Sequence, residues 1–133
     1  MNYFRTMEWF EELPEGCPPD DAYLPNNEQF FRLVEQYPPT ETDFLSQRRL
    51  YPQKSFHTNE CRARSLSMFS VLFECVNILK LPAHRNKRII QLKLPNKSGV
   101  ILQTGRAKTH YSWWRSKYYN PIPYCKEIEL NLI

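Results

Sequence analysis

The chain is poor in glycine, has no long apolar run and contains no closely spaced pair of cysteines. Its three glycines are scattered and cannot build a glycine-rich phosphate-binding loop. No stretch approaches the roughly 18 apolar residues that a membrane-spanning helix needs. The spacing of the four cysteines indicates no zinc site, even with the three histidines as possible partners. These absences argue against P-loop nucleotide binding, membrane insertion and metal binding, and we expect no metal.

The first residues indicate a cytoplasmic protein. Met1–Glu12 contains three acidic residues where a signal peptide would be apolar. In a reducing cytoplasm cysteines remain thiols, so we expect buried or free thiols at four positions: Cys17, Cys61, Cys75 and Cys125.

Charge is distributed unevenly along a chain whose composition is otherwise ordinary. The 133 residues fit one domain, with 41% apolar and 24% charged residues. Residues 1–44 have a net charge of −8, whereas residues 45–133 have a net charge of +12. The positive part predicts either a phosphate, nucleotide or acidic partner, or packing of the acidic N-terminal third across it.

A strand that leads directly into a helix forms the centre of the predicted fold. Ser65, Ser67 and Phe69 alternate with Leu66, Met68 and Ser70, a period of two that is typical of a half-buried strand. Leu72, Val76 and Leu79 then recur with helical spacing. We expect Ser70 to cap this helix and Pro82 to end it.

Other elements complete an α+β domain with a mainly antiparallel sheet and a central strand–helix unit. Before that unit we expect a short helix over Tyr3–Leu13, an irregular segment over residues 14–27, a strand over Glu28–Glu35, helical turns within Leu45–Tyr51 and a polar loop over Gln53–Arg62. After it we expect a strand over Arg88–Leu94, a hairpin into Val100–Gln103 through the turn Asn96–Gly99, and a last strand over Glu127–Ile133. Residues 1–27 would then be an N-terminal helix and irregular acidic segment, and residues 28–133 the core.

Three short motifs in order resemble those of the ADP-ribosyltransferase-like fold, including the small RES-type bacterial toxins. They are Phe31-Arg32 in an early strand, Ser65-Leu66-Ser67 before the helix and Glu127-Ile128-Glu129 in the last strand. The chain, including the stretch His110–Trp114, also resembles an uncharacterised family of small bacterial proteins. The resemblance implies an ADP-ribosyltransferase-like core and NAD as the substrate.

The resemblance also implies roles for individual side chains in ribosyl transfer or NAD hydrolysis, in a toxin or a phage–host conflict factor. Glu129, with Ser67, would be catalytic, because a carboxylate stabilises the positive charge that develops when the nicotinamide–ribose bond breaks. Arg32 would bind the phosphates through its bidentate fork. Ser65, His110, Tyr111 and Trp114 would complete the NAD site.

Two other functions stay open. Aromatic and basic residues alternate over Thr109–Tyr119, a pattern that suits single-stranded nucleic acid, although Trp113 and Trp114 equally suit core anchors. A non-catalytic interaction module, such as an antitoxin or a phage accessory factor, would use the acidic N-terminal third or exposed aromatics to contact a protein partner.

Overall fold

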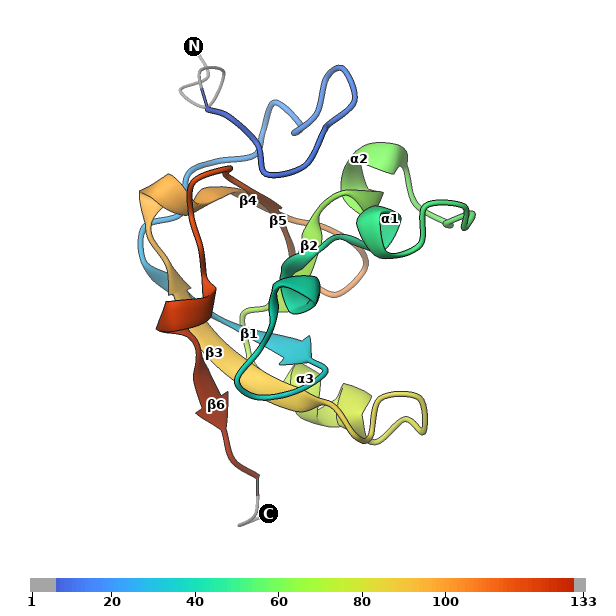
Figure 1. Ribbon diagram of the computed structural model, residues 1–133, viewed down its shortest axis with the longest axis vertical. Helices are drawn as coiled ribbons and strands as arrows, with labels where there is room; N and C mark the ends of the chain where they lie inside the picture. The colour runs from blue at the N-terminus through green and yellow to red at the C-terminus, as the bar shows by residue number, and fades with distance from the viewer. Residues whose placement is uncertain (1–6, 131–133) are drawn as a thin grey trace.

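A six-stranded antiparallel sheet organises the chain in the computed structural model, which describes residues 7–130 (Figure 1). The order across the sheet is β4-β5-β2-β1-β3-β6. The strands are β1 (Glu28–Val34), β2 (Leu66–Phe69), β3 (Arg88–Leu94), β4 (Gly99–Gln103), β5 (His110–Arg115) and β6 (Lys126–Ile128). The protein is therefore a small α+β domain, as the sequence predicted at this coarse level.

The helices are short and lie between the strands. They are α1 (Gln47–Leu50), α2 (Glu60–Ala63) and α3 (Leu72–Leu79), with 3-10 turns η2 (Glu41–Phe44), η3 (Asn96–Ser98) and η4 (Ile122–Tyr124). Side chains cap the first two, because Ser46 accepts a hydrogen bond from the Arg49 amide and Asn59 accepts one from the Arg62 amide. Among the described residues, no helix has the length and apolar character needed to cross a bilayer.

Alternation along the strands separates two apolar layers. In β2, Leu66 and Met68 are buried whereas Ser67 is exposed, as the sequence predicted. One face of the sheet packs the main core, whose largest buried members include Trp113. On the opposite face α3 covers a second cluster, in which Cys75 packs with Phe31 of β1.

The predicted hairpin between β3 and β4 is wrong. These strands lie far apart in the order of the sheet, because β4 pairs with β5 at one edge whereas β3 pairs with β1 and β6. The turn residues are nevertheless bent, since η3 spans Asn96–Ser98 and Gly99 adopts a φ of 135°. A Cβ at Gly99 would lie 2.0 Å from the Trp114 carbonyl oxygen, so only glycine allows β4 to start against β5.

Three predicted helix features differ from the structure. Residues 7–13 form no helix, because Trp9 bridges to Ser116 and the Phe10 amide donates to the Arg115 carbonyl; the start of that prediction lies outside the described residues. The N-cap of α3 is Val71 rather than Ser70, and it makes no side-chain cap. The loop predicted over Gln53–Arg62 gives way to α2 at Glu60.

A disulfide between Cys17 and Cys61 corrects the prediction of four thiols, which holds only for Cys75 and Cys125. The bond links the irregular N-terminal segment to α2 across 44 positions of sequence. Such bonds persist mainly in oxidising compartments. The disulfide therefore does not favour the predicted cytoplasmic location, which stays a prediction.

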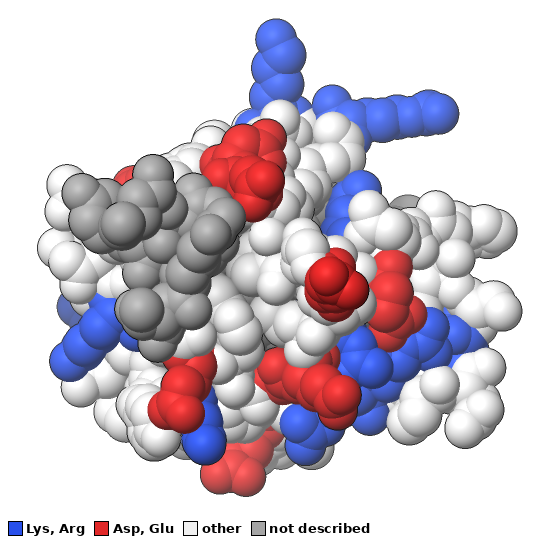
Figure 2. All heavy atoms as spheres, turned by 90° about the horizontal axis from the view of Figure 1, so that it is seen from above, with Lys and Arg blue, Asp and Glu red and all other residues white. Residues whose placement is uncertain are grey.

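The N-terminal segment also brings acidic residues onto the basic part of the chain. The Glu11 carboxylate accepts hydrogen bonds from the amide and hydroxyl of Ser46. The Arg64 guanidinium donates to the Glu12 carbonyl oxygen (2.9 Å), and the Arg115 guanidinium lies 3.7 Å from the Phe10 ring centroid. Seen from above, this face has acidic and basic side chains side by side (Figure 2). The N-terminal segment thus packs across part of the basic portion of the chain, through contacts that join no acidic side chain to a basic one.

Candidate functional site

Ser67 of β2 and Ser65, which directly precedes that strand, line a hollow beside α1 and α2, which we call the Ser67 hollow. It has a volume of about 380 Å³, within the lower range of small-molecule sites. Its walls include Gln47, Phe56, His57, Arg62, Ser65 and Ser67, and none of the described residues that line it is acidic. The structure therefore brings Ser65 and Ser67 together, at a site of positive character.

Ser65 and Ser67 differ in their freedom to meet a ligand. The Ser65 hydroxyl donates to the Arg62 carbonyl oxygen (2.7 Å), which fixes the end of α2. Ser67 is exposed, and among residues 7–130 only its backbone carbonyl, not its hydroxyl, has a side-chain hydrogen-bond partner. Ser67 is therefore the serine that can bond a ligand without breaking an existing contact.

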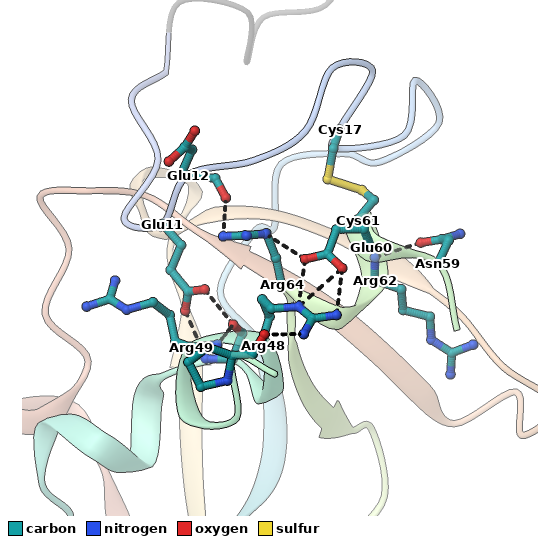
Figure 3. Close-up of polar contacts among 12 residues, drawn as sticks. Glu11, Glu12, Cys17, Arg48, Arg49, Asn59, Glu60, Cys61, Arg62 and Arg64 are labelled. Carbon is teal, nitrogen blue, oxygen red and sulfur yellow. Dashed lines mark hydrogen bonds and ion pairs between the residues drawn. A yellow bond between two sulfur atoms is a disulfide. The ribbon is translucent and has the colours of Figure 1, made fainter. Parts of the chain in front are cut away.

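Arg62 presents an unpaired guanidinium to this hollow. Its neighbours Arg48 and Arg64 both bind the Glu60 carboxylate, with N–O distances of 2.9 Å, and these contacts lower the Glu60 pKa. Figure 3 shows Arg62 pointing away from that cluster. Among the described residues no carboxylate pairs with it. The only acid in α2 is already neutralised by two other arginines, so Arg62 remains available to an anion.

His110 lies on the other side of Arg62. A Cβ added at Gly105 would lie 2.8 Å from an Arg62 terminal nitrogen and 3.7 Å from His110 Nδ1, so all three residues adjoin. His110 Nδ1 donates to the Thr104 carbonyl oxygen (3.1 Å). Burial and the Arg62 charge both lower the His110 pKa. His110 is thus a neutral neighbour of Arg62 that is bonded to the Thr104 turn, and it does not line the hollow.

Arg32 reaches Ser67 only through the backbone. Its guanidinium donates to the carbonyl oxygens of Asp43 (2.9 Å) and Ser67. Phe31 lies opposite Phe69, so Ser67 shares the Phe31 face of the sheet and the Arg32 side chain lies on the opposite face. Burial lowers the Arg32 pKa to about 10, which leaves it charged at neutral pH. Through these hydrogen bonds Arg32 links η2 to β2.

The two aromatic residues predicted to contact NAD are occupied by packing. Trp114 is 1% exposed and its indole N–H donates to the Cys61 carbonyl oxygen (2.9 Å). Tyr111 is half-buried, with its ring 5.1 Å from that of Phe30 at the edge of the main core. Trp113 is fully buried. The aromatic stretch therefore anchors the core, and neither tryptophan can stack on a ligand.

Glu129 lies at another place on the sheet. It lines a separate hollow of about 330 Å³ beside β6, with Lys87, Arg88 and Glu127. Glu127 is paired with Arg88. Strands β1 and β3 lie between β2 and β6, which separates Ser67 from that edge by roughly 14 Å. The structure thus does not bring Glu129 together with Ser67 and Arg32.

Sequence reasoning missed Arg62, His57 and Phe56, because they lie in a segment that reads as a polar loop. One signal was present: Asn59 followed by Glu60 is a helix start, and a helix there would have placed Arg62 near Ser65. Within residues 7–130 no three histidine, cysteine or acidic side chains gather as metal ligands.

Comparisons with protein-family models, with curated proteins and with solved structures find no match for this chain in any of the three.

Proposed function

We propose that this protein binds an NAD-type nucleotide at the Ser67 hollow, with Arg62 bound to its phosphate. One observation supports this above all: within the described part of the chain, an unpaired guanidinium and a free serine hydroxyl meet at a hollow that no acidic residue lines. Arginine suits phosphate because its planar fork donates two parallel hydrogen bonds.

The hollow divides into parts that suit the parts of a nucleotide. Arg62 and the exposed His57 provide donors for phosphate oxygens, and Ser67 with Gln47 provides hydrogen bonds for a ribose. The half-buried Phe56 ring adds apolar wall, and the Arg48 guanidinium lies 4.9 Å from its centroid. At about 380 Å³ the hollow admits one nucleotide half, so a dinucleotide would extend over the surface.

Cleavage of the nicotinamide–ribose bond is not part of this proposal. That step is helped by a carboxylate beside the ribose, and none of the described residues that line the Ser67 hollow is acidic. Glu129 lines the hollow beside β6 instead. We therefore propose a binding function, and we expect NAD to remain intact in the presence of the protein.

Isothermal titration calorimetry with NAD and with ADP-ribose tests this proposal. Arg62→Gln removes a charge-assisted bond to phosphate, which we expect to weaken binding by about 10- to 100-fold. Arg106→Gln is the matched control, because Arg106 is exposed and does not line the hollow. Absence of heat with both ligands, or equal affinities for the two variants, would contradict nucleotide binding here.

A further inference from the structure

A third and larger hollow lies along β3 beside the first residue of β6, and we call it the lysine–tyrosine groove. It has a volume of about 660 Å³ and lies beside η4, which is the 3-10 turn next to β3 and β6 in Figure 1. Its walls include Gln91, Lys93, Lys97, Tyr119, Tyr124 and Lys126. None of these lines the Ser67 hollow, so the two sites are separate.

Lysine side chains from three segments of the chain give this groove a positive charge. Lys93 belongs to β3, Lys97 to η3 and Lys126 to β6. Within the described part of the chain none of the three pairs with a carboxylate, and no acidic residue lines the groove. Three unneutralised amines around one hollow suit a ligand with several negative charges.

A stack of two tyrosines forms one wall. The rings of Tyr119 and Tyr124 lie 5.9 Å apart with an interplanar angle of 10°. Tyr119 is 5% exposed and fixed in the core, whereas Tyr124 is 59% exposed. A planar ring placed on the outer face of Tyr124 would extend the stack, which is how bases bind aromatic platforms in single-stranded nucleic-acid sites.

The edge of β3 adds unpaired backbone to the groove. Within residues 7–130, β6 pairs only with Ile89, Ile90 and Gln91 of β3, so Leu92–Leu94 have no strand neighbour on that side. The Leu94 carbonyl oxygen accepts from the Asn27 amide on the β1 side, so the peptide groups of Lys93 point towards the groove. Gln91 and Gln29 contribute side-chain amides, which donate and accept as base edges do.

We infer that the lysine–tyrosine groove binds a short single-stranded nucleic acid, with one base stacked on Tyr124 and phosphates bound by Lys93, Lys97 and Lys126. An acidic peptide would satisfy the lysines but leave the tyrosine face without a partner ring. The exposed ring and the charge together therefore favour nucleic acid.

Fluorescence anisotropy with labelled oligo(dT) and oligo(rU) of about ten nucleotides tests this inference. Tyr124→Ala should weaken binding by about tenfold or more, because stacking on the aromatic ring is lost. Tyr124→Phe keeps the ring and should bind like the unchanged protein. Tyr118→Ala is the control, since Tyr118 is 79% exposed and outside the groove.

The salt dependence of the binding affinity tests whether the lysines contact phosphates, and it does so without altering η4. Three phosphate contacts on a single strand predict a slope of log affinity against log salt of about −2, and Lys93→Gln should reduce its magnitude by about 0.7. Lys80→Gln, on an exposed residue after α3, should leave the slope unchanged. No binding at low salt, an unaltered affinity in Tyr124→Ala, an unaltered slope in Lys93→Gln, or equal competition by poly-glutamate would overturn the inference. Nucleotide binding at the Ser67 hollow would stand or fall separately, through Arg62→Gln.

Discussion

Reduction of the Cys17–Cys61 disulfide should destabilise the fold strongly. The bond closes a loop of 44 positions, and the chain-entropy relation gives about 4 kcal/mol of stabilisation for a loop of that length. For a domain of this size that free energy corresponds to a fall in melting temperature of about 15 °C. The released segment would be the one that packs Trp9 and Leu13 against the Trp114 cluster.

Differential scanning calorimetry with and without reductant measures this effect. The variant Cys17→Ser/Cys61→Ser is the matched control, because it has no bond to reduce and should melt at one temperature under both conditions. A thiol assay in denaturant should find two thiols before reduction and four after it, since Cys75 and Cys125 are free.

The two free thiols, Cys75 and Cys125, should not exchange with the disulfide in the folded protein. Burial raises the pKa of Cys75 to about 12 and that of Cys125 to about 11, so neither is a reactive thiolate at neutral pH. Four thiols in the unreduced protein, or an unchanged melting temperature after full reduction, would refute the reasoning about the N-terminal segment.

Two further substitutions test contacts near the candidate site. Arg32→Met should cost about 2–3 kcal/mol in urea unfolding, because it leaves the carbonyl groups of Asp43 and Ser67 without their donor; a loss below about 0.5 kcal/mol would contradict its role as a link between η2 and β2. The His110 pKa is lowered from 6.5 in the folded state, so protonation favours the unfolded chain and stability should fall as pH drops below 6.5. His110→Gln should flatten that fall between pH 7 and 5, and an identical pH profile for variant and parent would rule this out.

Local patterns predicted several strands in which burial alternates with a period of two, but not β5, in which Ser112, Trp113 and Trp114 are all buried. The strand over Arg88–Leu94 has the predicted bounds, and β1 begins at Glu28 as expected. Pairing was not predictable in the same way. The turn at Asn96–Gly99 is compatible with a hairpin, but the close approach of Gly99 to the Trp114 carbonyl directs the chain to the far edge.

The candidate site depended on that long-range pairing. Ser65 and Ser67 were predicted on one polar strand face, and both line the hollow. Glu129 was grouped with them from the order of motifs along the chain, which does not reveal that β1 and β3 lie between β2 and β6. Arg62 joins the serines only because α2 turns the chain back towards β2, with Asn59 as its cap.

The position of nucleotide binding tests the central claim most directly. Amide chemical-shift mapping during titration with NAD reads every residue at once, and Arg62→Gln serves as the reference titration. We predict that the largest shifts fall on Arg62, Ser65 and Ser67 and disappear in the variant. Shifts confined to the β6 edge around Glu129, or no shifts at millimolar NAD, would contradict binding at the Ser67 hollow.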